Sequence, residues 1–224
     1  MAKIIQKPAV IFDFDGVIVN TEQFHANAWH KTFKDQGLPV SREDCLPAVE
    51  LEDHLFAAQV LDRLAVKDDP RAWVRQKQLV FHTLLDQVQI YPGFSELAQA
   101  LAPQCQLAIV SSAWVENIEK VIKRAGLFDS FRVLVGKEDV TAHKPAPEGY
   151  LLAARRLGVS PKDCIVFEDS PTGIRSAKAA MMRCIGVAHR GNLKQLKEAD
   201  LIVPNLVDTA YLLKLIQIIG SVKF

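Results

Sequence analysis

The 224-residue sequence lacks several features that would place it in a specialised class. It has no uninterrupted apolar run near the roughly 20 residues that a membrane helix needs. Its first residues include Lys3 and Lys7 but no apolar stretch of signal-peptide length. The formal net charge is only +1, and no run of Lys and Arg stands out. We therefore expect neither nucleic acid nor membrane as a partner.

Cysteine is also scarce. The four cysteines are far apart in the sequence and show no metal-type spacing: Cys45, Cys105, Cys164 and Cys184. Cys105 and Cys164 lie at the starts of apolar runs, which favours buried, unreactive thiols. The sequence predicts a reduced, cytoplasmic and soluble protein, and nothing in it requires more than a monomer.

Short apolar runs alternate with helical patterns along most of the chain. The candidate strands are Val10–Phe12, Leu107–Val110, Val133–Val135, Ile165–Phe167, Ile185–Val187 and Leu201–Val203. The helical patterns between or after the later ones are Val115–Ala125, Glu148–Leu157, Thr172–Ala180 and Asp208–Ile218. This alternation predicts an α/β fold with a mostly parallel sheet and right-handed crossovers.

Residues 20–89 interrupt this alternation. They contain no convincing strand, but apolar residues recur at helical spacing, as in Phe24, Ala28, Trp29 and Phe33, and in Leu55, Ala58, Leu61 and Leu64. The sequence predicts a small helical domain over residues 20–89, inserted into a core domain of residues 1–19 and 90–224. Hinges at both crossings would let the insert close over the first strand's end and exclude water.

Two aspartates follow the first candidate strand. Asp13 and Asp15 come after the buried run, and Gly16 ends it with a tight turn. Ligands bind in open α/β sheets at this end of the strands. The alternative is a pair of turn-forming aspartates in a solvated loop, and the motif alone leaves both readings open.

Three later polar signals also follow candidate strands. They are the pair Ser111 and Ser112, then Lys144, and finally the pair Glu168 and Asp169. Taken singly, the serines and acids read equally well as helix caps, and the lysine as a loop charge. Taken together, all of these groups are expected at one edge of one sheet, which separate capping roles do not require.

The combination of these motifs resembles the haloacid dehalogenase superfamily. The segments DFDGV, a strand followed by Ser, KPAP and EDSPTG occur in this order, with a helical insert after the first. Within the superfamily, the whole chain resembles the phosphatases and mutases related to β-phosphoglucomutase. The resemblance implies a Rossmann-like core with a helical cap, dependence on Mg2+, and phosphoryl transfer through an aspartyl-phosphate.

The resemblance also implies a role for each motif residue. Asp13 would be the nucleophile and Asp15 the general acid and base. Asp13, Asp169 and Glu168 would offer oxygen ligands to Mg2+, together with the backbone carbonyl of Asp15. The transferred phosphate would be bound by Lys144, the Ser111 hydroxyl and backbone amides near Gly16 and Ser112.

Substrate selection is expected from the insert. Glu22 and His25 open it, and the family residue matching His25 faces the active site, although a lone helical histidine is as readily a satisfied structural residue. Asn20 departs from the Asp common in these relatives. The loop around Glu50 is acidic, and Trp114 stands where the mutase pattern has polar or basic residues.

These features favour a phosphatase acting on a small sugar or polyol phosphate, because they offer little to a second phosphate. The alternative within the family is a β-phosphoglucomutase-type mutase. A phospho-acceptor signalling module is a remote alternative, since such modules have no inserted cap and no acid at the position of Asp15. The presence of Asp15 and of the pair Glu168 and Asp169 argues against a dehalogenase.

Overall fold

The computed structural model describes residues 7–49 and 51–220. The chain forms two compact units, one of residues 21–88 and one of residues 1–20 with 89–224. Within the described ranges, no helix combines the length and the apolar character needed to cross a bilayer.

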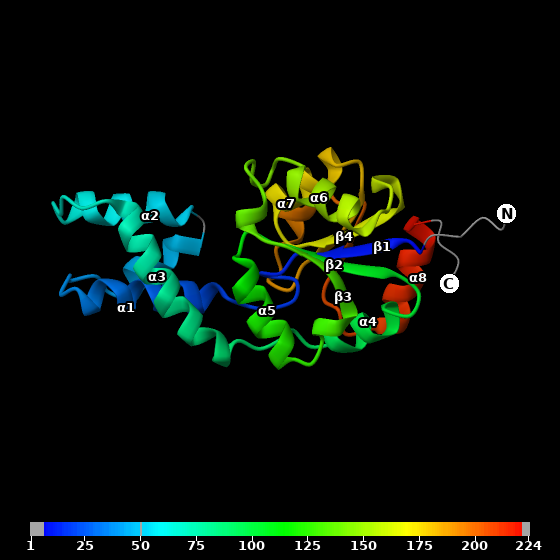
Figure 1. The fold of residues 1–224 in the computed structure, drawn as a ribbon, viewed down its shortest axis with the longest axis horizontal. Coiled ribbons are helices and arrows are strands. Elements are labelled where there is room, and N and C mark those ends of the chain that lie inside the picture. Colours follow the sequence, from blue (N-terminus) through cyan, green and yellow to red (C-terminus); the bar gives the residue numbers. More distant parts are fainter. Residues whose placement is uncertain (1–6, 50, 221–224) are drawn as a thin grey trace. The chain divides into compact units, whose positions relative to one another are not determined.

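The larger unit is built on a six-stranded parallel sheet of order β3-β2-β1-β4-β5-β6 (Figure 1). The strands are β1 (Ala9–Phe12), β2 (Gln106–Val110), β3 (Phe131–Val135), β4 (Cys164–Glu168), β5 (Arg183–Val187) and β6 (Leu201–Val203). All six predicted strands are present, and the predicted α/β class with a parallel sheet is confirmed.

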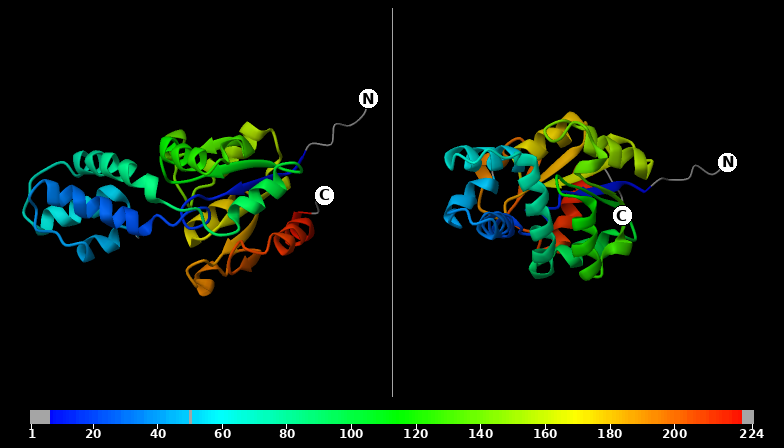
Figure 2. Two further views of the ribbon diagram at one scale, coloured as in Figure 1. Left: turned by 90° about the horizontal axis from the view of Figure 1, so that it is seen from below. Right: turned by 60° about the vertical axis from the view of Figure 1, so that its left-hand side comes forward.

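Helices cover both faces of this sheet, giving three layers (Figures 1 and 2). One face carries α6 (Glu148–Leu157) and α7 (Pro171–Ala179). The other carries α4 (Phe94–Leu101), α5 (Val115–Arg124) and α8 (Thr209–Gly220). Short 3-10 helices in this unit are η3 (Phe128–Ser130), η4 (Lys137–Asp139), η5 (Pro161–Asp163) and η6 (Leu193–Leu196).

The central strand β1 is buried along its whole length. Because side chains alternate across a strand, Ile11 faces the core under α6 and α7. Phe12 faces the other layer, where its ring lies 5.2 Å from that of Phe94 and 5.1 Å from that of Phe167. Burying each such side chain stabilises the fold by about 1.5–3 kcal/mol. The core thereby fixes where β1 ends and the aspartate loop begins.

The strand order reverses direction at β1. From β1 the chain proceeds to β2 and β3 on one side and then to β4, β5 and β6 on the other. A crevice at such a switch point, outside the carboxyl ends of the strands, is the usual ligand position. The loops after β1, β2 and β4 therefore meet at one edge.

The segments that leave and re-enter this unit are joined to each other. Val19 pairs in antiparallel fashion with Ile90. The Tyr91 amide donates to the Ile18 carbonyl at 2.8 Å. Backbone hydrogen bonds thus hold the two crossings side by side.

The smaller unit consists of α1 (Glu22–Asp35), η1 (Glu43–Val49), α2 (Asp53–Arg63), α3 (Pro70–Leu84) and η2 (Leu85–Gln87). Its core contains Trp29, Phe33, Phe56 and Trp73. The prediction that Leu55 belongs to the buried face of its helix is wrong, because Leu55 is 47% exposed. The larger Phe56, one residue further round the helix, is buried instead, with Ala57, Val60 and Leu61.

All four cysteines are buried and have free thiols. Burial raises the pKa of Cys105 to about 11 and that of Cys164 to about 12. Thiols with such pKa values are protonated and unreactive at neutral pH, as predicted.

Candidate active site

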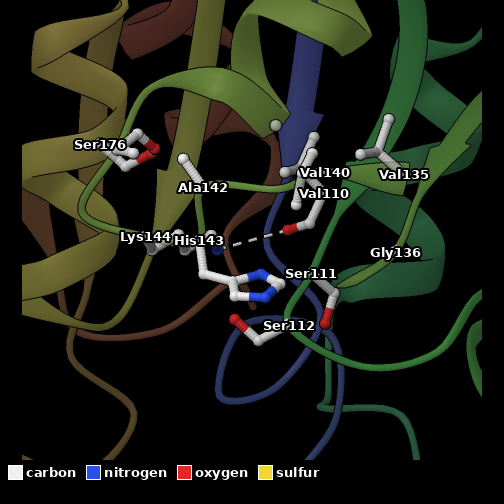
Figure 3. Close-up of a pocket in the computed structure, with 12 residues that line it drawn as sticks. Val110, Ser111, Ser112, Val135, Gly136, Val140, Ala142, His143, Lys144 and Ser176 are labelled. Carbon is white, nitrogen blue, oxygen red and sulfur yellow. Dashed lines mark hydrogen bonds between the residues drawn. The ribbon is translucent and has the colours of Figure 1, made fainter. Parts of the chain in front are cut away.

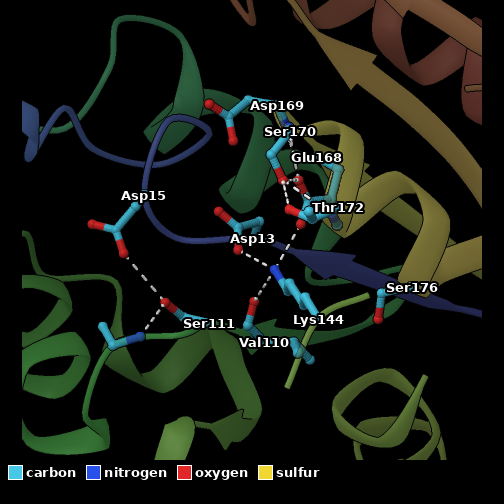
Figure 4. Close-up of polar contacts among 12 residues, drawn as sticks. Asp13, Asp15, Val110, Ser111, Lys144, Glu168, Asp169, Ser170, Thr172 and Ser176 are labelled. Atoms are coloured by element: carbon cyan, nitrogen blue, oxygen red, sulfur yellow. Dashed lines mark hydrogen bonds and ion pairs between the residues drawn. The ribbon is translucent and has the colours of Figure 1, made fainter. Parts of the chain in front are cut away.

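A charged cluster lies at the carboxyl ends of β1, β2 and β4 (Figure 4). Lys144, from the loop before α6, binds Asp13 Oδ1 at the end of β1. Its Nζ lies 2.6 Å from Glu168 Oε1, at the end of β4. It also donates to the Val110 carbonyl, at the end of β2, at 3.4 Å. The structure therefore brings together residues that are 131 positions apart in the sequence.

Protein donors occupy both oxygens of Glu168, whose side chain is wholly buried. Oε1 accepts from Lys144 and from the Tyr150 hydroxyl at 3.0 Å. Oε2 accepts from the backbone amides of Asp169 and Ser170 and from the Ser170 hydroxyl. A Cβ at Gly173 would lie 1.6 Å from Glu168 Oε1, so only glycine leaves room for this carboxylate. Glu168 thus holds Lys144 in place.

The pKa of Lys144 is raised. Burial disfavours the charged form of the amine, but attraction and hydrogen bonds from Asp13 and Glu168 outweigh burial. The lysine is therefore a permanent cation beside the Asp13 carboxylate.

Three carboxylates form a set suited to a divalent cation. Asp13, Glu168 and Asp169 each offer an oxygen, and these oxygens all lie within 4.8 Å of one another. Burial and repulsion among these carboxylates raise the pKa of Asp13 to about 8, against the attraction of Lys144, and that of Asp169 to about 9. Hard oxygen donors fit Mg2+, and its charge would favour their ionised forms. The residues present fit the expected cofactor.

Asp15 and Ser111 contact each other. The Ser111 hydroxyl lies 3.3 Å from Asp15 Oδ2 and accepts from the Ala113 amide at 2.9 Å. Ser111 follows β2, which pairs with β1, so the sheet itself brings the two side chains together. This contact orients the carboxylate expected to act as acid and base.

Gly16 lies in the loop after β1, and the expected phosphate contacts of the backbone amides near it stay a prediction. The Gly16 amide itself donates to the Val19 carbonyl at 2.7 Å. Gly16 has φ +89°, and a Cβ there would lie 1.9 Å from Asp169 Oδ2. Its contribution is the space that lets the Asp13–Asp15 loop approach Asp169.

Ser112 is exposed and lines a cavity of about 20 Å³ beside Lys144 (Figure 3). The lining residues are Val110, Ser111, Ser112, Val135, Gly136, Val140, Ala142, His143, Lys144, Ala146, Gly149 and Ser176. This volume holds about one water molecule.

Of the predicted substrate residues of the helical unit, His25 has structural partners within that unit. Glu22 lies in the first turn of α1. His25 Nδ1 is 2.8 Å from Lys77 Nζ, and its ring stacks on Phe81 with a centroid distance of 4.2 Å. Glu50 lies outside the described residues. The expected contacts of all three with substrate stay predictions.

Three further groups were not predicted from the sequence. Tyr150 binds Glu168, Arg190 binds Asp169, and Lys77 pairs with Asp53 within the helical unit. Tyr150 occupies an apolar helix face, where it looks like any core aromatic residue. Arg190 and Lys77 belong to no motif, so only the fold reveals their contacts.

Comparison with known proteins agrees with this geometry. A family model described as haloacid dehalogenase-like hydrolase matches residues 10–187. The chain is similar to fructose-1-phosphate phosphatase YqaB of Escherichia coli (strain K12), with 31% identity over 80% of this chain and 95% of the relative. It is similar to β-phosphoglucomutase of Bacillus subtilis (strain 168), with 29% identity over 89% of this chain and 90% of the relative. The crystal structure of CbbY from Rhodobacter sphaeroides in complex with phosphate superposes with a TM-score of 0.79 and 25% identity, covering 90% of this chain and 96% of that one.

Proposed function

The chain belongs to the haloacid dehalogenase-like hydrolases and is a phosphomonoesterase, and we propose that it acts on a small sugar or polyol phosphate with Mg2+ as cofactor. The observation that carries this proposal is the buried cluster in which Lys144 bridges Asp13 and Glu168 beside Asp169. A carboxylate nucleophile, a fixed cation and a hard-oxygen metal site are what phosphoryl transfer through an aspartyl-phosphate requires.

The reaction proceeds in two steps. An Asp13 carboxylate oxygen attacks phosphorus, the bond between phosphorus and the ester oxygen breaks, and Asp15 gives its proton to the departing alcohol. Water then attacks the aspartyl-phosphate, Asp15 takes a proton from that water, and the bond between phosphorus and Asp13 breaks. Inorganic phosphate leaves, and both carboxylates return to their starting states.

Asp13 and Asp169 are the side chains that we propose as ligands of Mg2+, with the Asp15 backbone carbonyl. When bound, Mg2+ neutralises repulsion between the phosphate and the nucleophile. Glu168, expected as a further ligand, is better suited to positioning, because both its oxygens already accept hydrogen bonds from the protein. Lys144 supplies a second positive charge to the transferred phosphate, and Ser111 contributes its hydroxyl.

We also propose that the helical unit acts as a cap that selects the substrate. Glu52 and His54 are exposed, and their side chains approach to 3.4 Å, so a polar pair stands at the start of α2. Such groups suit hydroxyl recognition. The four free thiols are compatible with a cytoplasmic setting.

One observation favours the mutase alternative. Trp114 stands where the mutase pattern has polar or basic residues. Lys137 Nζ lies 5.0 Å from the centroid of the Trp114 ring, so the fold brings a cation close to this position. A second phosphate needs such a charge. The relationship to β-phosphoglucomutase points the same way.

A phosphate-release screen over metabolite monophosphates, with and without Mg2+, tests the proposal. We expect Mg2+-dependent release from sugar or polyol monophosphates. The panel includes glucose 1-phosphate with glucose 1,6-bisphosphate, and isomerisation that outpaces phosphate release would replace the phosphatase with a mutase. Phosphorylation of one carboxylate per molecule without turnover would indicate a phospho-acceptor module.

A further inference from the structure

The segment after β5 is anchored to the active-site edge. The Ala188 amide donates to the Val203 carbonyl at 2.8 Å, and the Gly191 amide closes a turn onto the Ala188 carbonyl at 2.9 Å. The His189 ring stacks on Tyr91, with centroids 3.9 Å apart and ring planes at 7°. Asn192 Nδ2 donates to the backbone carbonyl of Asp169 at 3.0 Å. Residues 188–192 are therefore fixed on both sides of Arg190.

Arg190 reaches from this turn to the carboxylate cluster. Its Nη2 lies 2.9 Å from Asp169 Oδ2, and its side chain is 34% exposed whereas that of Asp169 is 7% exposed. The negative charges of Asp15 and Asp13 also attract the Arg190 guanidinium. A Cβ at Gly16 would lie 2.7 Å from Arg190 Nη2, so the same glycine makes room for both partners.

We propose that Arg190 competes with the divalent cation for Asp169 Oδ2 and thereby lowers the affinity of the site for that cation. The inference rests on the proposed function, in which Asp169 is a cation ligand. An oxygen that accepts from a guanidinium presents less of its charge to a metal ion. The fixed charge of Arg190 also repels a second cation at short range in a mostly buried site.

An opposite effect is smaller. By binding Asp169, Arg190 also orients its carboxylate, which would favour metal binding. The Asp169 backbone, however, is already held at both ends, by Glu168 Oε2 on its amide and by Asn192 on its carbonyl. These bonds fix the backbone from which the Asp169 carboxylate projects. We therefore expect the removal of the Arg190 charge to outweigh the loss of side-chain orientation. Arg190 acts through Asp169, so it is a positioning residue that sets how much Mg2+ the enzyme needs.

Calorimetric titration of the full-length protein with Mg2+ in the absence of substrate tests this competition. We expect Arg190→Gln to bind Mg2+ about tenfold more tightly than the wild type. Arg190→Lys keeps the charge but replaces the guanidinium, so its Mg2+ affinity should lie between those of Arg190→Gln and the wild type. The control is Arg175→Gln, which removes an equal charge from a half-exposed arginine paired with Glu198 at 3.6 Å. It should bind Mg2+ like the wild type.

A parallel readout is the Mg2+ concentration that gives half of the metal-induced rise in Tm, which should fall by the same factor in Arg190→Gln. Unchanged or weaker binding in Arg190→Gln would overturn the competition, as would equal tightening in Arg175→Gln. Asp169→Asn separates the two proposals. If it binds Mg2+ as well as the wild type, the proposed metal site is wrong. If it loses Mg2+ while Arg190→Gln matches the wild type, only the role of Arg190 is wrong.

Discussion

Tyr150 donates its buried hydroxyl to Glu168 Oε1 at 3.0 Å, the same oxygen that accepts from Lys144 at 2.6 Å. The two donors come from α6 and from the loop before it, and the acceptor ends β4. A helix that packs on the sheet thus fixes the acid that holds the active-site lysine.

Replacing Tyr150 with Phe should lower the free energy of unfolding by about 1–3 kcal/mol, because it removes a buried donor from a charged acceptor. Urea unfolding at neutral pH measures this change. Tyr211→Phe is the control, since Tyr211 is 50% exposed and should change stability little. Equal stability of Tyr150→Phe and the wild type would show that the hydrogen bond contributes nothing.

Asp13→Asn should reduce phosphate release by a factor of at least about 10³, because the amide is a poor nucleophile. The thermal transition should stay close to that of the wild type, since the two side chains have the same shape and Lys144 keeps its ion pair with Glu168. Asp129→Asn, an exposed change on η3, serves as control and should keep full activity. Near-normal turnover by Asp13→Asn would remove Asp13 as the nucleophile.

Asp15→Asn should slow hydrolysis of alkyl phosphates by about 10²–10⁴, the usual contribution of a general acid. Nitrophenyl phosphate should suffer less in the phosphorylation step, because nitrophenolate leaves without a proton. Single-turnover measurements on both esters give the comparison. The same loss for both would argue that Asp15 is not the acid.

Asp53→Ala should destabilise the helical unit by about 3–5 kcal/mol at pH 7, because Lys77, whose side chain is 0% exposed, loses its ion-pair partner. Fluorescence of Trp29 and Trp73 during urea unfolding reports on this unit. Asp35→Ala breaks an exposed pair with Lys31 and should cost less than about 1 kcal/mol.

The loss caused by Asp53→Ala should depend on pH. Burial opposes ionisation of Asp53, but Lys77 and the nearby His25 outweigh burial and hold its pKa below the ordinary 3.8. The ion pair therefore stabilises the fold fully above pH 3.8 and progressively less as pH falls through the lowered pKa. The gap between wild type and variant should narrow in acid, and a constant gap from pH 7 to pH 2 would contradict this.

Glu52→Gln and His54→Ala should change the ranking of substrates, shifting relative kcat/KM values about two- to tenfold through lost hydrogen bonds. Lys144→Met should lower activity on every substrate alike, because Lys144 contacts only the transferred group. Steady-state kinetics on three sugar or polyol phosphates distinguish the two patterns. If Lys144→Met changed the ranking of substrates while Glu52→Gln and His54→Ala did not, the residues that select the substrate would lie in the larger unit.

The sheet could be predicted because its strands are short apolar runs, of which β1 and β4 are buried along their whole length. Polar motifs follow β1, β2 and β4. The gathering of Asp13, Lys144 and Asp169 at one edge follows from parallel strand order. The contacts of Tyr150, Arg190 and Lys77 could not be predicted, since each depends on which helix face or loop the fold brings against a carboxylate. A sequence also does not show which loop amides are already engaged, as the Gly16 amide is by the Val19 carbonyl.

The pairing of Val19 with Ile90 makes the helical unit a replaceable module. The chain leaves the sheet and returns to it through hydrogen-bonded neighbouring backbone positions. Any insert whose ends lie equally close would satisfy the same bridge without altering β1 or its register with β2 and β4. We therefore expect that residues 21–88 can be exchanged for a different set of helices without moving the carboxylates and Lys144 at the carboxyl ends of the strands.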